Sequence, residues 1–347
     1  MASSLMNKAA AWLAADGPEP AMVVGTCGRL IRNLADFPFP QRCSAEDRAA
    51  VEQRVVGALE SLGFLGRGQY YAAANLAPRE LRFLGERILI GRDFAPGKKS
   101  CGVYVADDQC MSVLVNGTEH VAVRALASGL QIKEVWSRLN AVDDKLAGML
   151  GYAFSPDLGY LSSNLRTLGT GLRITAVAHV PALFEVNKVG AAKEQLCGQR
   201  YAFQDFYDAA DGEESDFVRL ANASTLGQSE EEIVFHLKHL VSEVISWEKD
   251  ARNALVHDAP RSLEDRVYRA VGVAREARLL DFPEAVRLVS SLRLGIGCGL
   301  FADYSFECIN RLHMDAHRGH IEMRLGQDCD DLTLNSERAD LFRERLA

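Results

Sequence analysis

The apolar pattern of this 347-residue chain changes about two thirds of the way along, and that change limits the folds open to it. Short runs rich in β-branched residues, bounded by Gly, Asn and Asp, dominate the first part and are typical of strands. They occupy residues 22–24, 103–105, 112–115 and 121–123. Two segments between them, 49–62 and 130–146, have apolar residues at helical spacing. The first part is therefore expected to combine strands and helices.

The last third of the chain has the pattern of helices alone. Ser229 and Glu232 form a capping-box signature ahead of an apolar stripe that continues to Ile245. A later helix is expected from Glu284 to Leu294, opened by Pro283 and ended by Gly295 and Gly297, because proline suits the first helical turn and glycine the end. The predicted fold class is α+β, followed by a small all-helical unit.

A domain junction is expected within residues 254–261, where Pro260 interrupts the helical pattern. The first domain is then residues 1–255 and the helical domain residues 256–347. A chain of 347 residues is long enough for two such units.

The composition excludes several classes of protein. Hydrophobic residues make up 48% and charged residues 25%, an ordinary globular balance, and the formal net charge is −8. This acidic balance argues against general nucleic-acid binding, which uses a basic surface. No apolar run approaches the roughly 18 residues of a membrane span, and residues 1–15 lack the regions of a signal peptide. The eight scattered cysteines are therefore expected to be reduced thiols in the cytoplasm.

The most distinctive motif is a glycine-containing phrase, TLGTGLR, at residues 167–173. A Gly-x-Gly loop with an arginine just beyond it suits a backbone wrapped around an anion. The alternative is a tight turn whose arginine, Arg173, pairs with a carboxylate, because short glycine motifs often occur by chance.

This phrase, with HVPAL at residues 179–183, resembles the signature of the ATP:guanidino phosphotransferases, and most closely that of the bacterial protein-arginine kinases. Further segments resemble the same family in the same order along the chain. They are residues 29–40 (RLIRNLADFPFP), 116–120 (NGTEH), 225–232 (TLGQSEEE), 263–269 (LEDRVYR) and 292–296 (LRLGI). The resemblance implies an antiparallel sheet flanked by helices, with a small helical C-terminal domain. It also implies transfer of the ATP γ-phosphoryl group to a protein arginine, with ATP and Mg²⁺ as cofactors.

The binding residues of the family carry over in part. Arg29 and Arg173 match arginines that hold phosphates in the family. The alternative is that Arg29 and Arg32 are surface charges, since a spacing of three on a strand-to-loop segment does not decide between the two. The resemblance also implies that the backbone of Gly169, Thr170 and Gly171 lines the ATP site.

Four other family positions hold a different residue type here. A phosphate-binding arginine is replaced at Cys27 and another at Ala122. The first catalytic glutamate falls at Thr118, and the family cysteine falls at Asn164. Removing one preorganised transition-state group typically costs about 10²–10³ in rate, so reduced or lost catalysis is expected.

Neighbouring residues offer compensation for these losses. Arg124 lies two positions after Ala122, so on a strand it points to the same face, and it is a further candidate for phosphate binding. Arg166 is an additional cation near the glycine loop. Glu119 follows Thr118, although one step along an extended strand turns a side chain to the other face.

The loop that carries the second catalytic glutamate in the family corresponds to residues 205–216, which include six acidic residues. Glu213 and Glu214 are the candidates for that catalytic carboxylate. The alternative is a solvated acidic loop, which is what such charge runs usually form. An anionic loop would attract arginine side chains of a protein substrate and would repel ATP.

Three functions are compatible with these residues. The first is a degenerate protein-arginine kinase that binds partners or arginine-bearing proteins. The second is an active kinase with relocated residues, among them Arg124 and a glutamate of the acidic loop. The third is a non-catalytic scaffold or regulator that uses the helical domain, for instance as a homodimer. The resemblance also implies a small zinc-binding adaptor and a protease-linked chaperone as partners.

Several histidines have both a structural and a functional interpretation. His120 and His179 are interpreted as buried histidines with satisfied hydrogen bonds rather than as catalytic bases. His313, His317 and His320 imitate metal-ligand spacing on a helix. No second cluster completes a tetrahedral set, so no metal site is predicted.

The C-terminal segment, residues 336–346, resembles the last helix of the protein-arginine kinases, where an Arg-Asp-x-x-Arg-Ala motif helps to bind phosphoarginine. Arg338 and Ala339 match the end of that motif, but its leading residues fall at Leu334 and Asn335. The alternative is a solvent-facing amphipathic helix.

Overall fold

A large antiparallel sheet forms the centre of the computed structural model, which describes residues 3–6, 8–91, 94, 99–197, 200–207 and 215–347. Its strand order is β2-β3-β4-β5-β1-β8-β10-β9, and every neighbouring pair is antiparallel. The strands are β1 (Val23–Arg32), β2 (Gly68–Ala72), β3 (Gly102–Ala106), β4 (Met111–Val115), β5 (Val121–Ser128), β8 (Leu172–His179), β9 (Tyr201–Asp205) and β10 (Phe217–Asn222). A separate hairpin consists of β6 (Phe154–Ser155) and β7 (Gly159–Tyr160).

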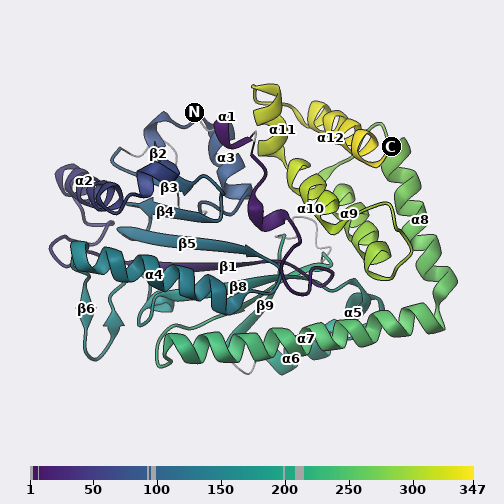
Figure 1. Cartoon of the computed structure of the whole chain (residues 1–347), viewed down its shortest axis with the longest axis horizontal. Coiled ribbons are helices and arrows are strands. Elements are labelled where there is room, and N and C mark those ends of the chain that lie inside the picture. Colours follow the sequence, from purple (N-terminus) through teal and green to yellow (C-terminus); the bar gives the residue numbers. More distant parts are fainter. Residues whose placement is uncertain (1–2, 7, 92–93, 95–98, 198–199, 208–214) are drawn as a thin grey trace.

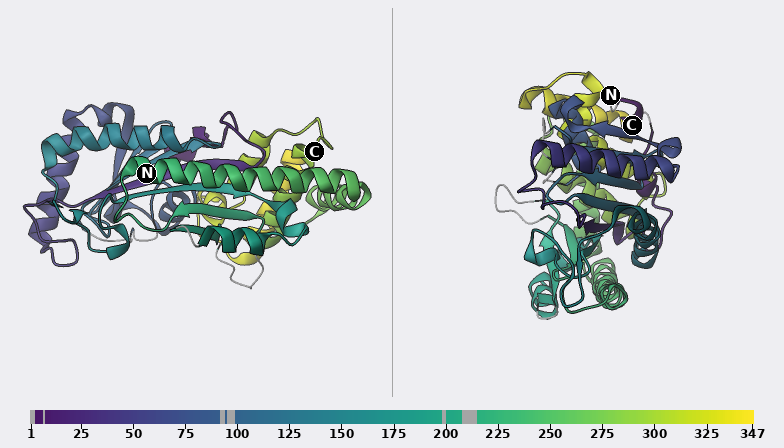
Figure 2. Two further views of the ribbon diagram at one scale, coloured as in Figure 1. Left: turned by 90° about the horizontal axis from the view of Figure 1, so that it is seen from below. Right: turned by 90° about the vertical axis from the view of Figure 1, so that its left-hand side faces the viewer.

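Helices flank the sheet and form the whole C-terminal third (Figure 1). Those before the C-terminal third are α1 (Ser3–Met6), α2 (Ala45–Ser61), α3 (Pro78–Glu86), α4 (Ile132–Leu150), α5 (Pro181–Glu185), α6 (Val189–Cys197) and α7 (Glu230–Asp258). They are followed by α8 (Pro260–Glu276), α9 (Phe282–Gly297), α10 (Phe306–Asp315), α11 (Arg318–Leu325) and α12 (Asp331–Leu346). Figure 2 shows α7 extending along one side of the molecule. Among the described residues, no helix is both long and apolar enough to span a membrane.

Alternation along the strands divides the apolar side chains between two cores. Leu30 of β1 and Val123 of β5 point to one face of the sheet, where α4 contributes Leu139. Ile31 and Leu126 point to the opposite face, which is covered by the N-terminal segment, α3 and C-terminal helices. The sheet is thus buried on both sides, which confirms the predicted class of an antiparallel sheet flanked by helices.

The C-terminal helices share a core with the sheet. Val289 of α9 and Met314 of α10 belong to the same apolar cluster as Val177 of β8 and Phe217 of β10. Hydrophobic burial, the main favourable term in folding, therefore fixes these helices against one part of this face. Arg29 lies on the same face, nearer the other end of β1.

The predicted elements lie where their patterns indicated. The four strand-like runs fall in β1, β3, β4 and β5, and the two helical segments fall in α2 and α4. Ser229 caps α7, its side chain accepting from the Glu232 amide, and the Glu232 carboxylate accepts from the Ser229 amide. These are local signals, and the tertiary structure leaves them unchanged.

One predicted helix is longer than expected, and of the two glycines expected to end it only Gly297 does so. Helix α9 begins after its N-cap Asp281 and continues to Gly297, past Gly295. A Cβ atom on Gly295 would lie 2.5 Å from the Phe301 ring and 2.6 Å from the Val267 side chain. Gly295 is therefore present because two other segments pack closely against the helix, and it does not end the helix.

Candidate functional site

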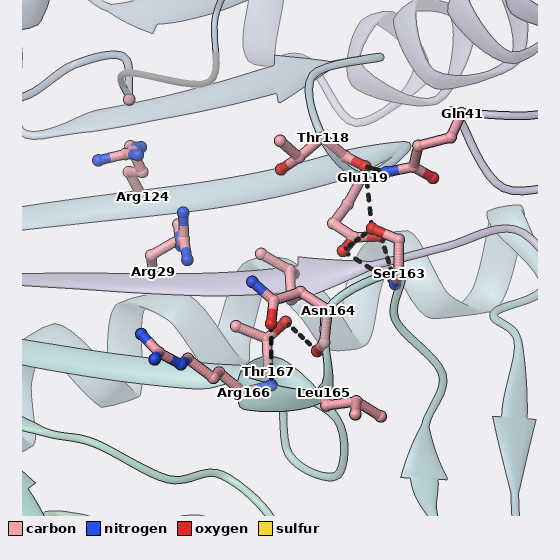
Figure 3. Close-up of a pocket in the computed structure, with 12 residues that line it drawn as sticks. Arg29, Gln41, Thr118, Glu119, Arg124, Ser163, Asn164, Leu165, Arg166 and Thr167 are labelled. Carbon is pink, nitrogen blue, oxygen red and sulfur yellow. Dashed lines mark hydrogen bonds between the residues drawn. The ribbon is translucent and has the colours of Figure 1, made fainter.

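A cleft of about 740 Å³ opens on the sheet face that carries Arg29 (Figure 3). Most of its lining comes from β1, β5, the turn before β5 and the segment before β8. The lining residues are Arg29, Ile31, Gln41, Gly91, Thr118, Glu119, Arg124, Ser163, Asn164, Leu165, Arg166 and Thr167. The cleft thus gathers residues that are more than 130 positions apart in the chain, as Arg29 and Arg166 show.

A row of arginines crosses three adjacent strands beside this cleft. Arg29 of β1 lies directly opposite Arg124 of β5 and directly opposite Arg173 of β8. Neighbouring strands are only about 4.8 Å apart, and like charges placed directly opposite each other destabilise a sheet. The three arginines repel one another, and an anion that binds across them relieves this repulsion.

Three cations at this cleft have no carboxylate partner in the part of the chain that the structure describes. The ion pairs there include none with Arg29, Arg166 or Arg173. Burial, and then the proximity of Arg29, lower the pKa of Arg173. The alternative in which Arg173 serves only to pair with a carboxylate therefore has no partner among the described residues.

Cys27 lies two residues before Arg29 on β1 and therefore on the same face of the sheet. Burial raises the pKa of its thiol, and the surrounding arginines oppose that effect without overcoming it. Those arginines are Arg124, Arg219, Arg173 and Arg29. The thiol is therefore neutral, and Cys27 does not supply the charge of the arginine that it replaces.

Arg124 takes a position that favours phosphate binding in place of the family arginine that is missing at Ala122. It points to the same face as Ala122 because the two are separated by one residue on β5, and it lines the cleft whereas Ala122 is buried opposite Ile31. The sequence placed Arg124 on the correct face. Its position opposite Arg29 depends on the register of β1 and β5, which the sequence does not specify.

Glu119 is the one carboxylate among the described residues that line the cleft. It is 4% exposed. Its oxygens accept hydrogen bonds from Asn33 Nδ2 (2.5 Å) and from Ser163 Oγ (2.6 Å), and the Ser163 amide donates to both of them. Thr118 also lines the cleft, so the expected alternation does not hold. The reason is that residues 116–120 form bends rather than an extended strand.

Asn164 and Arg166 belong to a short 3₁₀ turn, η4 (Leu165–Thr167), at the edge of the cleft. The Asn164 side chain accepts from the Arg166 amide (3.0 Å) and so caps the turn. This is a structural use for the residue that stands where the family has a cysteine. It leaves the Arg166 side chain in the cleft lining (Figure 3).

The glycine loop lies next to the cleft and does not contribute to its lining. The Gly169 amide donates to the Tyr160 carbonyl (3.3 Å), and the Thr170 amide donates to the Thr225 carbonyl (3.0 Å). Gly169 and Gly171 have positive φ values of 103° and 66°, which favour glycine. The Gly169 and Thr170 amides therefore already have protein acceptors. The contact of this backbone with ATP stays a prediction.

The candidate carboxylates Glu213 and Glu214 lie outside the described residues. Residues on both sides of that segment are well connected. Asp205 accepts hydrogen bonds from the amide (2.6 Å) and the hydroxyl (2.7 Å) of Ser215. Asp216 accepts from Arg266 Nη2 (2.8 Å) of α8. Helix α8 is therefore bonded directly to Asp216, two residues beyond Glu214.

Three charged or polar residues that the sequence left ambiguous are structural. Arg32, a possible surface charge, is 2% exposed and forms an ion pair with Asp143 (2.6 Å). Arg338 is buried in α12 and donates to the carbonyls of Leu280 and Ala316, so it does not face solvent. His179 is buried, and its Nε2 lies 2.9 Å from Ser290 Oγ.

The three histidines of α10, its C-terminal turn and α11 pack among aromatic rings. The His313 ring lies near that of Phe217, and the His317 ring near that of Phe282. His320 is 2.8 Å from the Glu86 carboxylate. Among the described residues, no group of three or more His, Cys, Asp and Glu side chains is placed to hold a metal ion.

The free energy of unfolding is expected to fall by about 2 kcal/mol between about pH 7 and about pH 4.5 through His120 alone. His120 is buried, its Nδ1 accepts from the Leu34 amide (3.1 Å), and burial lowers its pKa from 6.5 to about 4. Between these two values the unfolded chain binds a proton that the folded chain excludes, so stability is lost toward acid. Urea unfolding at both pH values measures the loss. His120→Gln should reduce it, and an equal loss in both proteins would contradict this explanation.

The fold is that of the guanidino kinases. A duplicated taurocyamine kinase from Schistosoma mansoni with bound transition state analog components has a TM-score of 0.60 at 21% identity over 68% of this chain. This chain spans 34% of that one. Lombricine kinase has a TM-score of 0.58 at 20% identity over 70% of this chain and 69% of its own.

Sequence relatives define the family more narrowly. The family model described as ATP:guanido phosphotransferase, C-terminal catalytic domain, matches residues 50–251. The model described as Protein-arginine kinase McsB C-terminal domain matches residues 260–347. Protein-arginine kinases of Symbiobacterium thermophilum and Geobacillus thermodenitrificans are each 32% identical over 97% of this chain, and the matches cover 96% and 93% of those proteins. The chain therefore belongs to the ATP:guanido phosphotransferase family, in its protein-arginine kinase branch.

Proposed function

We propose that this protein binds Mg·ATP in the cleft and presents the γ-phosphoryl group toward an arginine of a protein substrate, with reduced catalysis. Arg29, Arg124 and Arg166 contact the phosphates from the cleft lining, and Arg173 supports them from the adjacent strand. The observation that carries this proposal is the arginine row. Three arginines stand directly opposite one another across β5, β1 and β8, and a polyanion is the ligand that such a row favours.

The residues present fit a nucleotide triphosphate. Arg29, Arg166 and Arg173 have no ion pair among the described residues, so their charges are available to phosphate oxygens. No described cluster of side chains is placed to hold a metal ion. Mg²⁺ enters as the chelate of the ATP phosphates, where it would neutralise charge on the transferred group.

Catalysis is reduced because the acceptor side of the cleft is incomplete. A guanidinium is a poor nucleophile while it is protonated, so carboxylates must orient it and accept a proton. Glu119 is the carboxylate available among the described lining residues, and its oxygens already accept from Asn33 and Ser163. Thr118, in place of the family glutamate, offers no second carboxylate. The loss of one preorganised group alone typically costs about 10²–10³ in rate.

An active kinase with relocated residues is the second candidate. It is favoured by the presence of Arg124, Arg166 and Glu119 in one cleft, since these supply two cations and a carboxylate near the substituted positions. Glu213 and Glu214 keep their place in this proposal as possible second carboxylates. A scaffold that uses the helical domain alone is less favoured, because that domain shares a core with the sheet.

The partners follow from the family. A protein substrate bearing arginine is the first, and the small zinc-binding adaptor, the protease-linked chaperone and a homodimer stay proposals to be tested by co-purification. We also propose a boundary between the two units near residue 255, close to the end of α7.

Calorimetric titration of the purified protein with Mg·ATP tests the binding proposal. Binding in the micromolar range is the expected result. No heat up to millimolar Mg·ATP, with the protein shown to be folded by circular dichroism, would contradict it.

Incubation with ATP and an arginine-rich protein, followed by mass spectrometry under non-acidic conditions, separates the two candidates. Phosphoarginine that forms within minutes would favour the active kinase. Nucleotide binding with little or no phosphoarginine would favour the degenerate member.

A further inference from the structure

An exposed leucine stands at the rim of the cleft. The Leu165 side chain is 83% exposed and lines the cleft. Isolated apolar residues at a surface are common and need no explanation. The position of Leu165 within the proposed site is what gives it significance.

The turn that carries Leu165 is held in a defined conformation. Thr167 donates to the Asn164 carbonyl through its amide and its hydroxyl, both at 2.9 Å. Ser162 Oγ donates to the same carbonyl (2.7 Å), and Thr225 Oγ1 donates to the Arg166 carbonyl (3.2 Å). A side chain on such a turn is presented to a ligand with little further loss of conformational entropy, which is the advantage of preorganisation.

The cleft has two chemically different sides. Figure 3 shows Arg29, Arg124 and Arg166 on one side, and Glu119 with Ser163 on the other. Leu165 lies on the side of Glu119 and points away from the arginines. If the phosphates occupy the arginine side of the cleft, the guanidinium of a substrate arginine binds at Glu119. The residues that flank the substrate arginine then meet the rim near Leu165.

Other apolar side chains lie around Gly169, in the glycine loop that follows this turn. Gly169 pairs with Tyr160 of β7, and the Tyr160 ring lies 5.3 Å from the ring of Phe154, which is 58% exposed. On its other side Gly169 lies against the backbone of Leu226, which is also exposed. The surface beside the turn is therefore suited to an extended segment with apolar residues.

We propose that Leu165 is a specificity-determining residue that contacts a large apolar residue next to the target arginine of a protein substrate. This inference rests on the proposed function, since it places the substrate guanidinium at Glu119. The protein should therefore select arginines flanked by leucine or a similar residue over arginines flanked by serine.

Two fluorescent peptides test the inference, Gly-Ser-Leu-Arg-Leu-Ser-Gly and Gly-Ser-Ser-Arg-Ser-Ser-Gly, with binding followed by anisotropy with and without Mg·ATP. The unaltered protein should bind the leucine peptide about tenfold more tightly, which is the usual effect of burying one aliphatic side chain. Leu165→Ser should reduce this preference to less than about twofold and leave binding of the serine peptide unchanged. The substituted side chain is exposed, so folding should be unaffected.

Leu332→Ser is the matched control, because Leu332 is 66% exposed on α12 and does not line the cleft. It should keep the full preference. Absence of any preference in the unaltered protein, or a preference that survives Leu165→Ser, would overturn the inference. If Mg·ATP binds in the calorimeter and neither peptide binds, the inference also fails while the nucleotide proposal stands. If Mg·ATP does not bind but the leucine preference exists and depends on Leu165, the proposed function fails and the contact stands.

Discussion

Replacing Arg29 with alanine is expected to weaken Mg·ATP binding by a factor on the order of 10², because a charge-assisted contact at the centre of the phosphate site is lost. Arg29 is the middle member of the row and faces both Arg124 and Arg173. Removing Arg29 therefore leaves Arg124 and Arg173 as two separate cations instead of one continuous row. Calorimetric titration of the variant and the unaltered protein with Mg·ATP measures the change.

The same substitution should have the opposite effect on stability. Like charges directly opposite each other in a sheet are destabilising by roughly 0.2–1 kcal/mol per pair. Arg29→Ala removes two such contacts, so the free energy of unfolding without nucleotide should stay the same or rise. A variant that binds ATP less tightly and is also less stable would contradict the view that the row is a binding device.

Arg261→Ala is the control for the general effect of charge. Arg261 is exposed near the start of α8 and does not line the cleft, and its replacement removes one positive charge, as Arg29→Ala does. It should leave Mg·ATP binding within about twofold, since exposed charges beyond a Debye length are largely screened. Weakening as large as that of Arg29→Ala would show that the effect comes from overall charge.

Replacing Asp143 with alanine is expected to lower the free energy of unfolding by about 3–5 kcal/mol, the typical result of removing one partner from a buried ion pair. The Asp143 carboxylate accepts from Arg32 Nε (3.0 Å) and Arg32 Nη2 (2.6 Å). After the substitution the nearest carboxylate recorded for Arg32 is Glu230, at 3.6 Å. The buried guanidinium would then lack its main counter-charge.

The loss of stability should include the glycine loop, because Arg32 also contacts residues in and beside that loop. It donates to the Thr170 carbonyl (2.8 Å), and its guanidinium lies 3.5 Å from the centre of the Tyr160 ring. Urea unfolding followed by circular dichroism gives the free energy. Asp144→Ala is the matched control: Asp144 is exposed on the same helix, and its loss should change stability by less than about 0.5 kcal/mol. Equal changes in the free energy of unfolding for the two substitutions would show that the buried ion pair stabilises the fold no more than an exposed carboxylate does.

Much of the fold follows from local signals. The Ser229 capping box starts α7, and the β-branched runs become β1, β3, β4 and β5, because these signals act through backbone preference and neighbouring residues. Gly295 shows the limit of such reasoning. Its local preference is to end a helix, and the close approach of Phe301 and Val267 overrides that preference.

The candidate site was predictable to a smaller extent. The motif that contains Thr118 and Glu119 was visible in the sequence, but the assumption of an extended strand assigned the two side chains to opposite faces. Both line the cleft because the backbone bends there. A positive φ of 54° at Asn116, a residue type that tolerates this conformation, marks the start of that bend. The Asn-Gly pair at residues 116–117 was the one signal in the sequence that could have indicated it.

The sequence by itself determined the family, the α+β class with a helical C-terminal third, and the residue types at the substituted positions, because motif identity and hydrophobic period are properties of short segments. The tertiary structure alone decided that Arg124, Arg29 and Arg173 stand in one row, since strand register is set by pairing between segments up to about 140 residues apart, which no local pattern encodes. It also decided that Arg32 and Arg338 are buried while Arg29 and Arg166 line an open cleft. Arginines are identical in the sequence, and only the packing around each one determines whether it stabilises the fold or is available to bind a ligand.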